Sequence, residues 1–295
     1  MLSSHIMPTP RHILFPYDFS PQGREVARFV RGLAARCAAR ITLLSVIPPA
    51  FDPVPTDMDV LHLRTGDDVA AWRQRLQSRL SETLNDEFAG LAVNHVADSG
   101  DPALRITAFA EAQGVDLIMM PTHGVGTVRR YFVGSVTSKV LHDARCPVWT
   151  AAHVETHPAG DVPRTILCAI DGSKSTLPVV RGATEFASAV GAHLTLVHVV
   201  GPISDWPALE SERRLQEHVR EDARERITSV LSKAGVDLPL RVAVGDIVGA
   251  ATEDARQEQA DLMIIGRGSV SETFGRLRTH AFGLIQRAPC PVLSV

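Results

Sequence analysis

Residues 116–150 read DLIMMPTHGVGTVRRYFVGSVTSKVLHDARCPVWT, and this stretch decides the fold predicted for the chain. The apolar run Leu117–Met120 has the length of one buried strand. A loop with Gly124 follows, and nine residues separate this glycine from Gly134-Ser135. The amphipathic segment Val136–His142 comes next, and Pro147-Val148-Trp149 returns to a strand. The pattern therefore predicts a strand, a glycine loop, the start of a helix and a second strand.

The glycine loop indicates a phosphate-binding function. A glycine lets backbone N–H groups approach a ligand closely, and a helix N-terminus offers unpaired N–H donors with a favourable dipole. Gly124 and Gly134-Ser135 place two such points on either side of one loop. The alternative is a tight turn followed by an ordinary helix cap, because a glycine loop alone is weak evidence.

The chain repeats itself. Residues 12–47 and 165–200 each contain an apolar strand, an Asp, a Ser two residues later, a helix and a second strand. Two further pairs match in the same order, 98–120 with 243–265 and 144–150 with 288–294. Three matches in one order predict a tandem duplication.

The duplication predicts two domains, and local signals predict their elements. The first domain is placed at 1–151, a linker with Pro and Gly at 152–164, and the second domain at 165–295. Asp101 and Pro102 suit the Ncap and N1 positions of a helix that runs to about Gln113. Another helix is predicted from apolar residues at three- and four-residue spacing, Val69, Trp72, Leu76, Leu80 and Leu84. The other predicted elements are strands at 12–16, 41–47 and 91–98, a helix at 21–38 and a charged helix at 210–234.

Each copy thus alternates strands and helices. This alternation predicts an α/β fold made of two tandem doubly wound, Rossmann-like domains, each with a five-stranded parallel sheet covered by helices on both faces. Ligands of such sheets bind at the carboxyl ends of strands, where the strand order reverses. Asp18 follows the first strand and the glycine loop follows the fourth, so we expect them to be neighbours.

The composition is that of a globular protein. The 295 residues are 45% hydrophobic and 21% charged, and the formal net charge of -3 gives no global reason to expect nucleic-acid binding. No apolar run approaches the roughly 20 residues that span a bilayer. The N-terminus lacks the apolar core of a signal peptide, and the four cysteines have neither C-x-x-C nor zinc-finger spacing. We expect a cytoplasmic protein with reduced, buried cysteines and without a nucleic-acid or membrane partner.

With these motifs in view, nearly the whole chain resembles the universal stress protein family, twice over. The ATP-binding members of that family share a loop written G-x2-G-x9-G-[ST]. Gly124, nine residues and Gly134-Ser135 fit this spacing, whereas Pro121 stands where the first glycine is expected. Proline removes one N–H but fixes only its own φ, so the rest of the loop stays usable.

The resemblance implies a set of nucleotide-binding residues. Pro16 and Asp18 match the end of the first strand, which lies along the nucleoside in the family, and Val46 matches the position that contacts adenine. Met120 matches the residue just ahead of the loop. The full implied set is Pro16, Asp18, Val46, Met120, Pro121, His123, Gly124, Gly134, Ser135, Val136 and Thr137. The implied cofactor is ATP, with or without Mg²⁺, and no residue is assigned a catalytic or metal-binding role.

Some of these residues have other interpretations. Asp18 and Asp171 resemble catalytic carboxylates, but each stands just ahead of a helix, so we interpret them as helix caps and Asp18 also as a ribose contact. His123 is interpreted as a loop-shaping residue that faces ligand or solvent rather than as a general base. His193 and His198 lie on one strand and have no partners at metal-ligand spacing.

The second copy departs from the motif. Gly266 follows its fourth strand, but counting back from Cys290 places Arg278-Thr279 where the first copy has Gly-Ser. Arginine brings a Cβ and a long side chain to a site that favours close backbone approach, so we expect weak or no nucleotide binding there. The alternative is that Arg278 supplies charge to a phosphate from another direction.

The sequence therefore predicts a tandem universal stress protein whose first domain binds ATP or another adenine nucleotide and which acts in stress-response regulation. Two alternatives stay open: a slow ATPase or phosphotransfer enzyme, and an interaction module that binds no nucleotide. The Cys-Pro-Val strands at 146–150 and 290–294 are expected at sheet edges, where the two copies pair with each other. The long helices stay exposed, which leaves a homodimer open.

Overall fold

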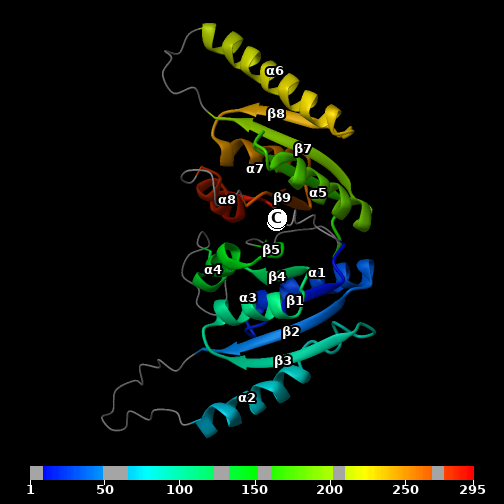
Figure 1. Ribbon diagram of the computed structural model, residues 1–295, viewed down its shortest axis with the longest axis vertical. Coiled ribbons are helices and arrows are strands. Elements are labelled where there is room, and N and C mark those ends of the chain that lie inside the picture. Colours follow the sequence, from blue (N-terminus) through cyan, green and yellow to red (C-terminus); the bar gives the residue numbers. More distant parts are fainter. Residues whose placement is uncertain (1–8, 49–65, 123–132, 152–160, 202–209, 268–275) are drawn as a thin grey trace, which may run out of the picture.

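The predicted alternation of strands and helices is present in the computed structural model (Figure 1). The structure describes residues 9–48, 66–122, 133–151, 161–201, 210–267 and 276–295. The first copy contains β1 (His12–Pro16), α1 (Pro21–Cys37), β2 (Arg40–Ile47), α2 (Gly66–Ser81), β3 (Val93–Ser99), α3 (Pro102–Ala112), β4 (Leu117–Pro121), α4 (Ser135–Asp143) and β5 (Val148–Ala151). The second contains β6 (Thr165–Ile170), α5 (Thr176–Val190), β7 (His193–Val200), α6 (Glu210–Lys233), β8 (Leu240–Val244), α7 (Ile247–Gln257), β9 (Leu262–Ile265), α8 (Arg276–Arg287) and β10 (Val292–Ser294).

The ten strands found in the described residues form one sheet. Its order is β3-β2-β1-β4-β5-β10-β9-β6-β7-β8, so the order within one half mirrors that within the other. Neighbours within each half are parallel, whereas β5 and β10 pair antiparallel, with Leu293 opposite Trp149. Figure 1 shows α2 and α6 at the two far ends and β5 with β9 near the middle.

Helices cover both faces of the sheet, because the strands are apolar on both sides. One core cluster joins alternate strand residues such as Phe15 and Leu196 to α1, α5 and α6. The other cluster joins the intervening strand residues, such as Leu14 and Val197, to α3, α4, α7 and α8. Two covered faces on parallel strands are what a doubly wound fold requires, and the predicted fold class is confirmed.

Two local predictions can be compared with the observed helices. The start of α3 is confirmed: Asp101 is its N-cap and accepts a hydrogen bond from Leu104 N at 3.1 Å. The helix predicted from Val69 to Leu84 is wrong at its end and in part of its apolar face. It ends at Ser81, and Trp72 is 45% exposed, whereas Leu80 and Leu84 are buried. Leu84 has a φ of 60°, a left-handed conformation that a continuing helix excludes.

None of the described helices combines the length with the apolarity that crossing a bilayer requires.

Candidate nucleotide site of the first domain

The strand order reverses between β1 and β4. β1 pairs with β2 on one side and with β4 on the other, with Ile13 opposite Leu117. From this point the chain winds outward to β3 in one direction and to β5 in the other. The carboxyl ends of β1 and β4 are therefore adjacent, which is where ligands of doubly wound sheets bind.

The end of β1 leads directly into α1. Pro16 is buried and Asp18 is exposed. The N-cap of α1 is Ser20, whose Oγ accepts from Gly23 N at 3.0 Å, while Asp18 Oδ1 accepts from Ser20 N at 3.0 Å. The interpretation of Asp18 as the helix cap is therefore wrong, because Pro21 at the start of the helix places the cap two residues later.

The end of β4 and the start of α4 are tied together. Gly134 N donates to Thr122 O at 2.7 Å, and Thr137 Oγ1 donates to Pro121 O at 3.1 Å. Thr122, 1% exposed, also donates from Oγ1 to Ala151 O at 2.9 Å. These bonds hold together the residues on either side of segment 123–132, Thr122 before it and Gly134 after it.

Gly134 is the N-cap of α4 and offers no side chain for capping. Its own N–H is used by Thr122, so Ser135, Val136 and Thr137 supply the N–H groups of the first helical turn. Within the described part of the chain, no acceptor is assigned to these three N–H groups. An anion at this point would meet donors and the positive end of the helix dipole.

Val46 and Met120 share one face of the sheet. Met120 is buried among residues of α3 and α4, and Val46 packs against the same cluster. Pro16, at the end of the strand between them, pairs with Leu44. The structure thus brings Pro16, Asp18, Val46, Met120, Pro121 and residues 134–137 to one edge of the sheet. His123 and Gly124 lie outside the described residues.

A surface ion pair links α4 to the start of α3. Lys139 Nζ lies 3.0 Å from Asp101 Oδ2, and both side chains are largely exposed. The pKa of the Asp101 carboxyl is lowered, first by the hydrogen bond from Leu104 N and then by the bond from Lys139. Because both side chains are exposed, the pair contributes little to the stability of the fold.

The corresponding edge of the second domain is built differently. α8 begins at Arg276, so position 278, which the sequence aligns with Gly134, lies inside the helix instead of capping it. Gly266, which corresponds to Pro121, follows β9 directly. Arg267 follows it and donates through its guanidinium to Ala144 O, the C-cap of α4, at 2.7 Å and to Cys146 O, between α4 and β5, at 2.5 Å. The start of the last helix therefore differs between the two copies, and so does the position held by Pro121 in the first and by Gly266 in the second.

Sequence reasoning missed two residues that shape the first site. Ser20 could have been found, because a Ser directly before a Pro is a common helix start. Thr122 carries no local signal, since its partner Ala151 comes 29 residues later.

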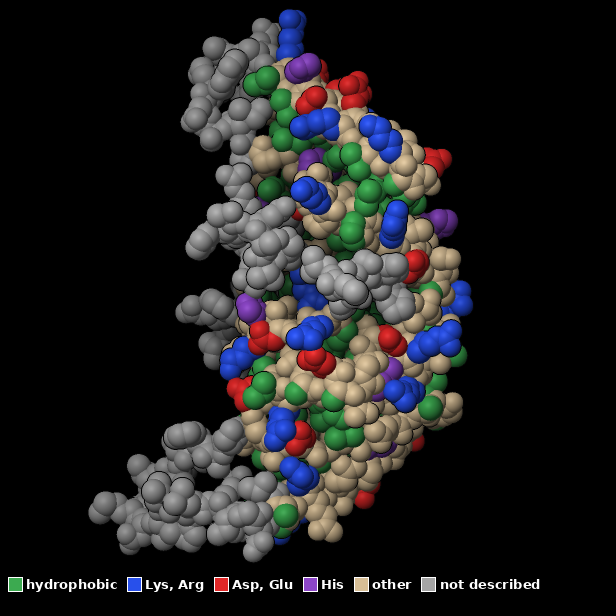
Figure 2. Space-filling view, in the orientation of Figure 1, with side chains coloured by type: hydrophobic (Ala, Val, Ile, Leu, Met, Phe, Trp, Pro, Cys, Tyr) green, Lys and Arg blue, Asp and Glu red, His purple; other side chains and the backbone are tan. Residues whose placement is uncertain are grey.

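Charges on the surface are mixed. On the face drawn in Figure 2, basic and acidic side chains are interspersed over the described residues. Among these residues, no group of three or more His, Cys, Asp or Glu is placed to hold a metal ion.

Comparison with known proteins identifies the family. The model of the universal stress protein family matches residues 9–151 and again 163–295. A universal stress protein from Mycolicibacterium smegmatis is 26% identical over 289 residues, which cover 96% of each chain. One from Methanocaldococcus jannaschii is 27% identical over 152 residues, 47% of this chain and 92% of the relative. The crystal structure of a universal stress protein from Archaeoglobus fulgidus has the same fold, with a TM-score of 0.64 and 21% identity over 98% of this chain and 96% of that one. The two matches of the family model cover nearly the whole sequence, so the chain belongs to the universal stress protein family, with two tandem copies of its domain.

Proposed function

We propose that the first domain binds ATP or another adenine nucleotide at the edge where β1 and β4 diverge, and that the protein acts in stress-response regulation. The observation that carries this proposal is the start of α4. A residue without a Cβ caps the helix, and three backbone N–H groups follow it at the reversal point of the sheet. The same position in the second domain lies within α8.

The positions of other residues support the remaining contacts of this proposal. The phosphates lie on the N–H groups of residues 135–137, with Mg²⁺ as their counter-ion when it is bound. The ribose lies toward Asp18, whose carboxylate is exposed. Adenine lies toward Val46 and Met120, which face the same layer.

Pro121 is compatible with this arrangement. It lies within β4, opposite Ala151, and its carbonyl accepts from Thr137 Oγ1. Its ring removes an N–H at the strand end and leaves the donors of the first turn of α4 in place.

Isothermal titration with ATP and Mg²⁺ tests the proposal through Gly134→Ala. Gly134 has a φ of -56°, which alanine adopts without strain, so the variant should fold normally. The added Cβ intrudes where the phosphate approaches, and we expect binding to weaken by roughly tenfold, equivalent to about 1.4 kcal/mol. Unchanged affinity would show that the phosphates bind elsewhere.

A matched pair of variants assigns binding to one domain. Asp18→Asn removes the charge at the end of β1, and Asp171→Asn makes the same change at the end of β6. We expect Asp18→Asn to weaken ATP binding and Asp171→Asn to leave it unchanged. The reverse result would move the nucleotide to the second domain.

We also propose that the antiparallel pairing of β5 with β10 takes the place of pairing between separate subunits. The pairing covers the last strand of each copy, so neither is left as an open edge. A cytoplasmic location and a homodimer through the outer helices stay predictions. Light scattering after size exclusion measures the mass, and a mass of one chain would exclude the homodimer.

A further inference from the structure

We propose that the second domain has a separate binding site for a small aromatic molecule that carries an N–H donor, between the ends of β6 and β7 and helix α6. The site is a cavity of about 170 Å³. Its lining combines polar groups with an apolar wall and consists of Asp171, Gly172, Thr176, His198, Ala223, Arg226, Ile227 and Val230. An apolar cavity of about 150 Å³ is large enough to bind benzene.

In the first domain, the side chain of Phe19 takes the position that corresponds to this cavity. Gly172 has a φ of 75°, and the residue at the same point of the first copy, Phe19, has a φ of 62°, so the two turns match. The ring of Phe19 packs against Tyr17, and the guanidinium of Arg79 lies over it, 4.0 Å from the centroid. The second copy has no side chain at Gly172, and the cavity lies beside it.

Arg226 is the counterpart of Arg79. Each lies on the helix that follows the second strand of its copy. Each also stands directly before a buried aliphatic residue, Leu80 in α2 and Ile227 in α6. Arg226 Nε lies 3.3 Å from Asp222 Oδ2, an exposed pair one helical turn apart. A ring in the cavity would lie next to this guanidinium as Phe19 lies next to Arg79, and such stacking is favourable.

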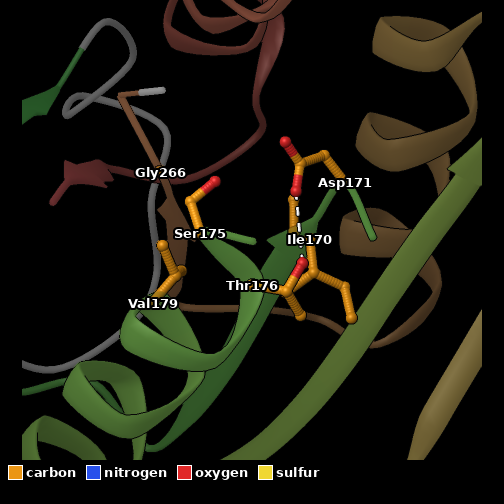
Figure 3. A pocket seen from close by; sticks show the side chains of 7 residues that line it. Ile170, Asp171, Ser175, Thr176, Val179 and Gly266 are labelled. Carbon is orange, nitrogen blue, oxygen red and sulfur yellow. Dashed lines mark hydrogen bonds between the residues drawn. The ribbon is translucent and has the colours of Figure 1, made fainter. Parts of the chain in front are cut away.

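Two acceptors give the site its polarity. His198 Nδ1 donates to Ile170 O at 2.9 Å, since a carbonyl only accepts, and the neutral ring therefore keeps Nε2 as an acceptor. Asp171 Oδ1 accepts from Ser173 N at 2.9 Å and from Thr176 Oγ1 at 3.2 Å. Figure 3 shows its second oxygen directed away from Thr176. In the first copy, Ser45 stands in place of His198.

The apolar wall comes from α6. Ala223 and Ile227 are buried, and Val230, which also lines the cavity, is 45% exposed. A bound ring would cover part of Val230. The lining thus fits an aromatic ring whose N–H faces Asp171 and His198 and whose face lies against Ile227 and Arg226.

This site is distinct from the proposed nucleotide site. It belongs to the second domain and to the sheet face covered by α5 and α6, whereas Val199, the counterpart of Val46, packs on the opposite face. Loss of nucleotide binding in the first domain would leave the aromatic site intact.

Aniline and benzene are the probes. Their binding to the full chain is measured by the shift of the Ile227 methyl signal in NMR spectra. We expect both to shift this signal and aniline to bind more tightly, because only aniline donates to Asp171 or His198. Equal affinities for the two probes would overturn the assigned donor. Absence of any shift at Ile227 with aniline would overturn the site.

Gly172→Phe places in the cavity the side chain that the first copy has. We expect aniline binding to fall by roughly tenfold or more, since ring and ligand compete for one space, and thermal stability to exceed that of Gly172→Ala, because the ring fills the cavity. Gly172→Ala is the matched control, because it brings the same left-handed strain without the ring. Its Cβ meets only His198 Cε1, at 3.6 Å, so aniline binding should persist.

Ala223→Leu fills the same cavity from α6 and keeps the test valid if Gly172→Phe does not fold. Aniline binding of wild-type strength in either folded variant would overturn the proposal.

Discussion

His12 is a buried side chain whose hydrogen bonds require its imidazole ring to be neutral. The guanidinium of Arg40 donates to Nδ1 at 3.0 Å, so Nε2 carries the proton and donates to Thr42 Oγ1 at 2.8 Å. The side chain is buried. Burial, followed by the charge of Arg40, lowers the pKa of His12 below its ordinary value. Protonation would break the bond from Arg40 and set two cations side by side.

The consequence is a loss of stability in acid. Between the folded pKa and the unfolded value of about 6.5, the unfolded chain binds more protons, so the free energy of unfolding falls as pH falls through this window. Above that window the contribution of His12 is fully present. We expect His12→Gln, which does not titrate, to be less stable than wild type at about pH 8 by roughly 1–3 kcal/mol.

Urea unfolding of both proteins at several pH values checks this prediction. Because other groups titrate in both proteins, the informative quantity is the difference in free energy between them. It should shrink toward about pH 5, as wild type loses the contribution of its neutral imidazole. A difference that stays constant with pH would contradict the prediction.

The start of α1 shows how one element is secured. Ser20 is 1% exposed, and its Oγ satisfies Gly23 N. The corresponding N-cap of α5, Ser175, makes no such bond. Its Oγ lies 2.6 Å from Ser173 Oγ, and Asp171 holds Thr176 Oγ1. Helices at the same point of the two copies thus begin in different ways, because α5 begins later relative to its strand than α1 does.

This difference makes a matched pair of variants. Ser20→Ala leaves Gly23 N without its acceptor in a buried place, and we expect a loss of about 1 kcal/mol, within a range of roughly 0.5–2 kcal/mol. Ser175→Ala should cost less, because no cap bond is lost. Chemical unfolding of both variants measures the difference. Equal losses would mean that the Oγ of Ser20 does not stabilise α1 as a cap.

At the scale of the molecule, Arg267 adds a side-chain contact between the two halves beside the pairing of β5 with β10. It follows β9 in the second domain and donates to two carbonyls of the first, Ala144 O at the C-cap of α4 and Cys146 O between α4 and β5. Burial lowers the pKa of Arg267, and burial also raises the pKa of the Cys146 thiol to about 11. The thiol is therefore neutral, and the guanidinium is stabilised by the carbonyls and the negative end of the α4 dipole.

Arg267→Met keeps an unbranched side chain but removes the guanidinium, so Ala144 O and Cys146 O lose the donor that Arg267 supplies. Hydrogen bonds to a charged group contribute about 1.5–3 kcal/mol, so we expect a loss of this order in the free energy of unfolding. Arg164→Met is the control, since Arg164 stands exposed at the start of β6. Thermal unfolding followed by calorimetry should show a lowered midpoint for Arg267→Met alone. Similar midpoints for both variants would show that the contacts of Arg267 between the two halves do not stabilise the protein.

Many of the elements could be predicted because their signals are local. Asp101 and Pro102 set the start of α3 through bonds within one helical turn, and the apolar run Leu117–Met120 is found in β4. The duplication is also written in the sequence and predicts equal topology in both halves. The prediction failed where packing overrides periodicity: Trp72 has helical spacing but lies beyond the part of α2 that reaches the core.

The candidate site could be predicted only in part. The spacing from Gly124 to Gly134 marks the loop, and the resemblance supplies Asp18 and Val46. The role of Ser20 depends on where α1 begins, and that of Thr122 on a strand that comes later in the chain.

The sequence by itself determined that this protein has two α/β copies and which segments form most of their strands and helices, because periodicity, caps and repeats act over a few residues or are visible by alignment. The tertiary structure alone decided the register of β5 on β10, the reach of Arg267 to α4, and the cavity that Gly172 leaves where Phe19 fills the first copy. These features depend on residues that are far apart in the chain and on how completely side chains fill the space between elements, and no local pattern encodes either.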